Sequence, residues 1–321
     1  MTTLPQGSAI VVAGGAGFIG SHLCDRLLDD GYRVIALDDL STGNANNIAH
    51  LASADNFIFM EGDIVDRSTI DALDDVVDQT DVSAVMNFAS PASPPAYLER
   101  PLDTLAVGSA GTWNLIDYTL ACGARFFMAS TSEVYGDPLE HPQVETYWGN
   151  VNPIGERSVY DEAKRFSEAL VASHQRSAGL DARIVRIFNT YGPRMQPDDG
   201  RVVTNMVHQS LAGKPLTIYG DGSQTRSFCY VSDEVDGIVK LLQSDVTSPI
   251  NIGNPNEFTI RELASVIAEV LEIELSVEYL PLPSDDPKVR QPDITQARKL
   301  LGWEPRVQLS DGIRRMVDSL R

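Results

Sequence analysis

A short apolar run that leads into closely spaced glycines lies near the start of the chain. Residues Ser8–Ala13 read SAIVVA, and Gly14, Gly17 and Gly20 follow within a turn and the first residues of a helical pattern. A strand, a glycine turn and a helix in this order let the backbone approach a pyrophosphate, which then sits at the helix N-terminus. This feature restricts the chain to an α/β fold that begins with a dinucleotide-binding unit.

Strand-like and helix-like segments alternate through the first half of the chain. Arg33–Leu37 and Arg125–Ala129 have the length and apolar character of buried strands, whereas Leu102–Ala121 and Tyr160–Ser177 have the length of long helices. This alternation predicts a Rossmann-like doubly wound parallel sheet with helices on both faces.

The pattern changes after residue 188. Glycine and proline become more frequent and the expected strands become short, which predicts a smaller C-terminal α/β lobe that binds substrate. We therefore place a dinucleotide-binding domain in residues 1–188 and a substrate-binding lobe in residues 189–321. No linker rich in proline, serine or glycine separates them, so we expect a soft boundary between interleaved units.

The chain is strongly acidic. Its 321 residues include 45 aspartates and glutamates but only 25 lysines and arginines, for a net charge of −20. Because a phosphate backbone or an anionic membrane requires a basic surface, we expect neither nucleic acid nor a membrane as a partner. The three cysteines, Cys24, Cys122 and Cys229, are scattered, which argues against a metal site and favours a cytoplasmic location.

A carboxylate at the end of the second expected strand bears on the choice of dinucleotide. Asp38 is placed to accept hydrogen bonds from an adenosine ribose diol and would repel a 2′-phosphate, which favours NAD over NADP. Asp63, after the third expected strand, is either a partner for the adenine amino group or a solvated loop carboxylate. The residues predicted to bind NAD are Gly14, Gly17, Phe18, Ile19, Gly20, Asp38, Asp39, Ser41, Thr42, Gly43, Asp63, Ile64, Ala89, Tyr160, Lys164 and Thr190.

Two residues with catalytic chemistry share one face of a predicted helix. Tyr160 and Lys164 are four residues apart, and a nearby ammonium favours the phenolate of a tyrosine, whose free pKa is about 10. Such a pair can remove a proton from a hydroxyl while hydride leaves for NAD. Thr131 and Glu133 follow the strand Arg125–Ala129, at the edge of the sheet where ligands bind. Thr131 can bond the reacting hydroxyl, and Glu133 can act as an acid, a base or a water-orienting group.

Several longer stretches resemble one family of enzymes. FASPASPPAYLERP, ASTSEVYGDP, YWGNVNPIGERSVYDEAKR and RIFNTYGPRM are among the motifs, which run from residue 14 to about residue 305. On these motifs the chain resembles the extended short-chain dehydrogenases/reductases that act on nucleotide sugars, and specifically the UDP-glucuronate decarboxylases (UDP-xylose synthases). The resemblance implies an NAD-dependent carbon–carbon lyase that converts UDP-glucuronate to UDP-xylose through a 4-keto intermediate and regenerates NAD.

Related activities remain as alternatives. A nucleotide-sugar 4,6-dehydratase resembles this chain but has an aspartic acid where Ser132 stands, and a serine hydroxyl is too weak an acid to expel water. A 4-epimerase usually has a small residue in place of Glu133. A decarboxylase that releases the 4-keto pentose and a protein that binds NAD without catalysis are further alternatives.

The resemblance also implies a nucleotide-sugar site in the C-terminal lobe. It implies that Arg226 reaches the reacting end of the sugar, and that Arg201 and Arg290 hold the UDP, since a guanidinium bonds two phosphate oxygens at once. The predicted catalytic residues are Thr131, Glu133, Tyr160, Lys164 and Arg226. The predicted substrate-binding residues are Ser90, Pro91, Tyr97, Asn114, Asn189, Arg201, Val202, Tyr219, Gln224, Arg226 and Arg290.

The helix Leu102–Ala121 departs from the family pattern. Ala106 and Gly108 stand where many relatives carry a lysine, which contacts their substrate, and an asparagine. By the same resemblance, this helix and Tyr160–Ser177 pair across a two-fold axis into a four-helix bundle, so that the protein is a homodimer.

Overall fold

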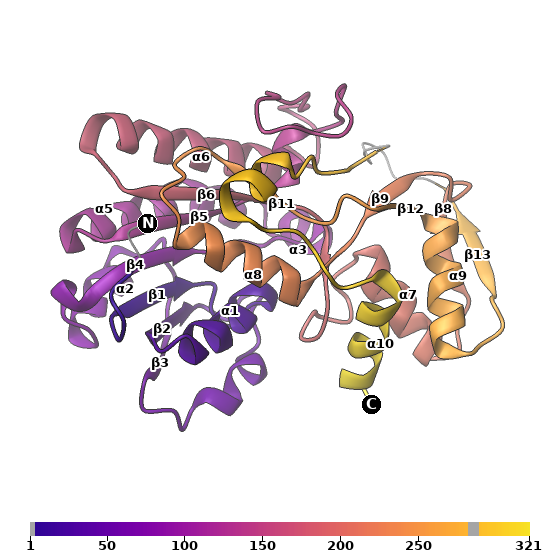
Figure 1. Ribbon diagram of the computed structural model, residues 1–321, viewed down its shortest axis with the longest axis horizontal. Helices are drawn as coiled ribbons and strands as arrows, with labels where there is room; N and C mark the ends of the chain where they lie inside the picture. Colours follow the sequence, from indigo (N-terminus) through magenta and orange to yellow (C-terminus); the bar gives the residue numbers. More distant parts are fainter. Residues whose placement is uncertain (1–3, 282–288) are drawn as a thin grey trace.

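A seven-stranded parallel sheet lies at the centre of the computed structural model, which describes residues 4–281 and 289–321 (Figure 1). In spatial order its strands are β11 (Ile250–Ile252), β6 (Ala182–Ile187), β5 (Arg125–Thr131), β4 (Val82–Asn87), β1 (Ala9–Ala13), β2 (Arg33–Asp38) and β3 (Phe57–Glu61). Every neighbouring pair is parallel. Because the chain moves outward from β1 in both directions, ligands are expected at the carboxyl ends of the strands near β1 and β4. The predicted Rossmann-like sheet is confirmed.

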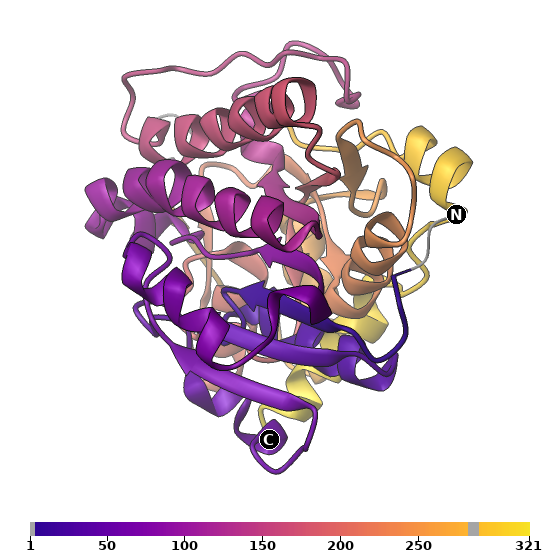
Figure 2. The ribbon, with the colours of Figure 1, turned by 90° about the vertical axis from the view of Figure 1, so that its left-hand side faces the viewer.

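Helices cover both faces of this sheet. They are α1 (Phe18–Asp29), α2 (Arg67–Asp71), α5 (Thr112–Cys122), α6 (Ser158–Ala178) and α8 (Val231–Leu242). Successive strand residues point to opposite faces, so Ile10 packs in the apolar cluster that includes α1 and α8, while Val11 packs with α2, α5 and α6. Figure 2 shows α5 and α6 side by side on the outside of the second face. β1 is therefore apolar throughout and fully buried.

The expected regular helix Leu102–Ala121 is interrupted. It consists of α4 (Pro101–Ala106), a π-helical turn (Val107–Gly111) and α5. The Ser167 hydroxyl of α6 donates to the Gly108 carbonyl at 2.6 Å, and a Cβ on Gly108 would lie 2.7 Å from that of Ala163. The close approach of α6 thus requires a glycine there, and the extra residue of the π-turn accommodates the contact.

Most of the chain after residue 189 forms a smaller lobe. Its elements are β7 (Thr190–Tyr191), α7 (Val202–Leu211), β8 (Leu216–Tyr219), β9 (Thr225–Ser227), β10 (Cys229–Tyr230), β12 (Glu257–Thr259), α9 (Ile260–Leu271), β13 (Val277–Leu280) and α10 (Leu309–Ser319). β8 pairs with β13 and β7 with β10 in parallel, whereas β9 pairs with β12 antiparallel. The predicted smaller lobe is therefore present.

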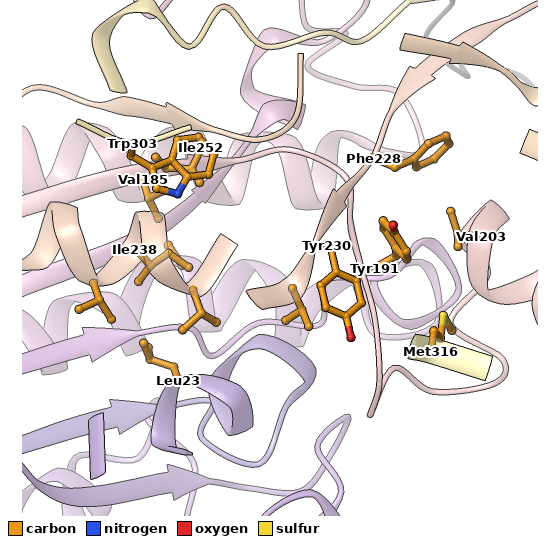
Figure 3. Close-up of a cluster of buried hydrophobic side chains, with 14 of the residues drawn as sticks. Leu23, Val185, Tyr191, Val203, Phe228, Tyr230, Ile238, Ile252, Trp303 and Met316 are labelled. Atoms are coloured by element: carbon orange, nitrogen blue, oxygen red, sulfur yellow. The ribbon is translucent and has the colours of Figure 1, made fainter. Parts of the chain in front are cut away.

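The sheet and the lobe share one apolar core. Figure 3 shows Leu23 and Ile238, which lie beside the sheet, in the same cluster as Val203 and Met316 of the lobe. β11 and α8 come after residue 189 in the chain yet belong to the sheet and its cover. The site between the two units is therefore built on one continuous apolar core. Within the described residues, no helix combines the length and the apolar character needed to cross a membrane.

Candidate active site

A cavity of about 760 Å³ lies between the sheet and the smaller lobe. Its walls include residues at the carboxyl ends of β1, β5 and β6 and residues from α7, β8 and β9. This volume is ample for a ligand of nucleotide size. Of the residues predicted from the sequence, those that line it are Gly14, Gly17, Phe18, Ile19, Gly20, Thr42, Ser90, Tyr97, Thr131, Glu133, Tyr160, Lys164, Asn189, Thr190, Arg201, Val202, Tyr219, Gln224, Arg226 and Arg290.

The glycine turn at one end of the cavity has no room for side chains. Gly14 has φ +81°, and a Cβ on it would lie 2.6 Å from the Phe88 carbonyl carbon. A Cβ on Gly20 would lie 2.0 Å from the Gly14 carbonyl oxygen. The first turn of α1 therefore lies directly on the loop that follows β1, and its N-terminus is open to the cavity as a dinucleotide pyrophosphate requires.

Asp38 lies at the end of β2, beside this turn. Its carboxylate accepts hydrogen bonds from the Ala16 and Leu40 backbone N–H groups at 3.0 and 2.9 Å. Burial raises the pKa of Asp38, and the two N–H groups oppose that rise. A Cβ on Gly43 would lie 2.4 Å from a carboxylate oxygen of Asp38, so the loop after β2 closes over this side chain. The site thus holds a fixed acceptor where an adenosine ribose is expected.

Some predicted residues do not line the cavity. They are Asp38, Asp39, Ser41, Gly43, Asp63, Ile64, Ala89, Pro91 and Asn114. The Asn114 amide donates to the Ile64 and Val65 carbonyls at 3.0 and 3.1 Å, so it holds the loop after β3. Asp63 accepts from the Val65 N–H. Direct contact of these residues with cofactor or substrate stays a prediction.

Tyr160 and Lys164 share one face of α6, as expected. Burial raises the pKa of Tyr160 to about 12, although Arg201 and the neighbouring Thr131 side chain act in the opposite direction. The Lys164 ammonium lies 5.8 Å from the Tyr160 ring centroid and donates to the Ala129 carbonyl. Burial lowers the pKa of Lys164 to about 8. Because the tyrosine resists ionisation here, an added positive charge is needed to make it a base at neutral pH.

A second tyrosine forms the wall beside Tyr160. Tyr97, from α3 (Pro94–Glu99), stacks on it with ring centroids 5.2 Å apart and an interplanar angle of 10°. Its hydroxyl is buried and has no hydrogen-bond partner among the described residues. A buried hydroxyl without a partner at a cavity wall is suited to receive a ligand group, which agrees with the predicted sugar contact.

Glu133 bridges two arginines. Its carboxylate accepts from Arg157 at 2.6 Å and also from Arg290, which donates in addition to the Gly136 carbonyl at 3.2 Å. Burial alone would raise the pKa of Glu133, but Arg290 and Arg157 outweigh it and hold the pKa at about 2. Glu133, Arg157 and Arg290, called the ion cluster below, all line the cavity. As an ionised carboxylate, Glu133 is a poor proton donor at neutral pH.

The structure adds to the predicted roles of the arginines in the ion cluster. Arg290, predicted at the UDP, lies against Glu133 with 4% of its side chain exposed, and its contact with UDP stays a prediction. Arg157, three residues before Tyr160, was not predicted at all. An arginine at the start of a helix resembles any surface charge, so the residues around it carry no signal that it faces inward.

Two further arginines reach the cavity from the lobe. Arg201, at the start of α7, pairs with Asp199 at 3.2 Å and donates to the Ala92 carbonyl at 2.7 Å. Arg226, on β9, donates to the Thr225 carbonyl at 2.8 Å. Both guanidinium groups line the cavity of an otherwise acidic chain, which suits a ligand with anionic groups.

Known proteins resemble this chain over nearly its whole length. The family described as GDP-mannose 4,6 dehydratase matches residues 11–316. The chain is 51% identical over 312 residues to UDP-glucuronic acid decarboxylase 1 of Arabidopsis thaliana, covering 97% of this chain and 69% of that protein. UDP-glucose 4-epimerase of Thermotoga maritima, solved with UDP-glucose, has a TM-score of 0.89 at 29% identity and covers 97% and 98% of the two chains. UDP-glucuronic acid 4-epimerase of Bacillus cereus, solved with UDP-glucuronic acid and NAD, has a TM-score of 0.84 at 28% identity with the same coverage.

Proposed function

Because the chain belongs to the GDP-mannose 4,6-dehydratase family and, within it, to the UDP-glucuronic acid decarboxylases, we propose that it converts UDP-glucuronate to UDP-xylose. The enzyme is an NAD-dependent carbon–carbon lyase of the extended short-chain dehydrogenase/reductase type. A 4-keto sugar forms, loses carbon dioxide and is reduced again, so the cofactor ends each cycle oxidised.

The ion cluster beside Tyr160 is the observation that carries this proposal. Two guanidinium groups converge on the single carboxylate of Glu133 inside the cavity. Such an arrangement accepts a further carboxylate, which UDP-glucuronate has and UDP-glucose lacks. Ser132 is 3% exposed and offers no acid for the departure of a hydroxyl group, which argues against a dehydratase.

The glycine turn and Asp38 fit a dinucleotide. Backbone atoms lie where a Cβ on Gly14 or Gly20 would be. Asp38 supplies a hydrogen-bond acceptor at the end of β2. We infer that these residues hold NAD, which when bound supplies the acceptor and donor of hydride at C4. Its positive charge also adds to that of Lys164.

The chain's own residues then perform the proton chemistry. Thr131 holds the C4 hydroxyl of the sugar in place and Tyr160 takes its proton. Lys164 stabilises the phenolate of Tyr160. Arg157 and Arg290 orient the C6 carboxylate of the substrate. Once C4 is a ketone, this carboxylate belongs to a β-keto acid and leaves as carbon dioxide. The resulting enolate is protonated at C5 before C4 is reduced.

A direct assay tests the proposal. The purified protein is incubated with UDP-glucuronate and NAD, and the nucleotide sugar and carbon dioxide are followed by mass spectrometry. We expect carbon dioxide and UDP-xylose in equal amounts, and no reaction of UDP-glucose in a parallel control. Unchanged mass with a new sugar isomer would indicate a 4-epimerase, and a 4-keto pentose with stoichiometric NADH would indicate the releasing decarboxylase. Either result would overturn the proposal.

We also propose a homodimer through α4, α5 and α6. Leu102, Leu105, Trp113 and Phe166 are exposed on these helices, at 76%, 38%, 49% and 47%. Pairing across a two-fold axis would bury this apolar face in a four-helix bundle. Sedimentation of the protein and of Leu102→Asp tests this proposal, and we expect the variant to dissociate. A cytoplasmic location stays a prediction.

A further inference from the structure

A second carboxyl group lies beside the ion cluster. Asp161 follows Tyr160 on α6, and its backbone N–H donates to the Arg157 carbonyl at 3.2 Å. Only 6% of the residue is exposed, and its Oδ1 is buried without a hydrogen-bond partner among the described residues. None of the steps described above uses this group.

The surroundings of Asp161 oppose its ionisation. An ionised carboxylate without hydrogen bonds is costly to bury. Burial is the largest cause and the negative charge of Glu133 is the second, and they raise the pKa of Asp161 to about 7. Arg157 and Arg290 act in the opposite direction. The titratable and charged groups that act on it come from α3, α6, the turn after β5 and the segment after residue 288, and they are Tyr97, Glu133, Arg157, Tyr160, Glu162 and Arg290.

The summed charge of Asp161 and the ion cluster therefore depends on one proton. With Asp161 neutral, the two guanidinium groups of the ion cluster exceed the single carboxylate of Glu133 by one positive charge. With Asp161 ionised, positive and negative charges are equal. An incoming carboxylate is attracted in the first state and finds no net attraction in the second.

We propose that Asp161 is a positioning residue for substrate recognition. As a neutral acid it leaves the ion cluster with one net positive charge that receives the carboxylate of the substrate, and its ionisation cancels that charge. The inference rests on the proposed function, because it assumes a substrate that carries a carboxylate. It adds a specificity determinant outside the residues that line the cavity.

Kinetics at two pH values test this inference. The KM for UDP-glucuronate is measured at about pH 6 and about pH 8.5, on either side of neutrality, alongside the inhibition constant of UDP-glucose, which carries the same diphosphate but no carboxylate. In the wild-type enzyme we expect KM to rise about tenfold with pH while the inhibition constant of UDP-glucose stays constant. In Asp161→Asn, which keeps the shape but has no proton to lose, KM should be low at both pH values. Glu269→Gln, which removes an exposed carboxylate on α9 that does not act on Asp161, should keep the wild-type rise.

Two results would overturn the inference. The first is a wild-type KM for UDP-glucuronate that changes with pH in the same way as the inhibition constant of UDP-glucose. This measurement requires only the wild-type enzyme. The other is an Asp161→Asn enzyme whose KM rises with pH as in the wild type. A purely structural role of Asp161 would lower kcat at every pH without flattening the KM profile. Failure of the proposed function is distinct, since no carbon dioxide would then form at any pH.

Discussion

The cofactor end and the substrate end of the cavity are built in different ways. At the cofactor end, Gly14 and Gly20 lie close in sequence, and backbone packs against backbone. At the substrate end, charged side chains meet from distant segments, and Glu133 and Arg290 are 157 residues apart. The cofactor end depends on close packing, and the substrate end depends on the balance of charges. An added methyl group should therefore impair cofactor binding, and removal of a charge should impair the reaction of the substrate.

The largest effect is expected where the two ends meet. Tyr160→Phe removes the hydroxyl that acts as the base but keeps the ring that stacks on Tyr97. Turnover of UDP-glucuronate should fall by about 1000-fold, the typical contribution of a positioned general base, while substrate binding changes little. Single-turnover kinetics of C4 oxidation measure this step. Tyr279→Phe, a control at an exposed position on β13, should have no effect, and near-normal turnover of Tyr160→Phe would remove Tyr160 as the base.

A single methyl group tests the cofactor end. In Gly20→Ala the new Cβ would meet the Gly14 carbonyl oxygen at 2.0 Å, and both are backbone positions that cannot turn away. We expect a loss of about 3 kcal/mol or more in the free energy of unfolding and no measurable NAD binding in calorimetry. Gly179→Ala is a control with open space around the Cβ but φ +69°, and it should cost only about 1 kcal/mol. If the two variants lost the same free energy of unfolding, close packing would not explain why position 20 requires glycine.

The same contrast decides how much the sequence could reveal. The spacing of Gly14, Gly17 and Gly20 reflects a local backbone requirement, so the turn and the parallel sheet around it were predictable. The partner of Glu133 depends on how a segment near residue 290 returns to the sheet, and nothing local to Arg290 encodes that. Arg157 was missed for the same reason. The π-helical turn at Val107–Gly111 was also missed, because it depends on a contact with α6.

Removal of one charge tests the substrate end. Glu133→Gln leaves Arg290, which is almost fully buried, without its counter-ion and disturbs the orientation of Arg157. We expect kcat/KM for UDP-glucuronate to fall about 100-fold, whereas the affinity for NAD is preserved because the glycine turn is untouched. Glu269→Gln, which removes an exposed carboxylate on α9, is the control. A parallel loss of NAD binding would contradict the separation of the two ends.

The smallest effect concerns a carboxyl group that belongs to neither end. Glu234 on α8 is fully buried; its Oε2 accepts from the Thr190 hydroxyl at 3.2 Å, and its Oε1 has no partner among the described residues. Burial raises the pKa of Glu234 well above its ordinary value. The stability that its proton contributes is therefore complete below about pH 4 and is lost as the pH rises towards the folded-state pKa.

Glu234→Gln removes this proton equilibrium without removing the hydrogen-bonding side chain. Relative to the wild type, the variant should gain free energy of unfolding as the pH rises from about pH 5 to about pH 8, measured by urea denaturation at each pH. Glu262 gives a control of opposite sign, because hydrogen bonds from Thr259 lower its pKa. Glu262→Gln should therefore be less stable than the wild type at neutral pH, and this difference in the free energy of unfolding should shrink as the pH falls. Turnover and NAD affinity should be unchanged in Glu234→Gln, since this carboxyl lies behind Thr190 rather than in the cavity. A change in the KM for UDP-glucuronate would mean that charge behind the wall also acts on the substrate end.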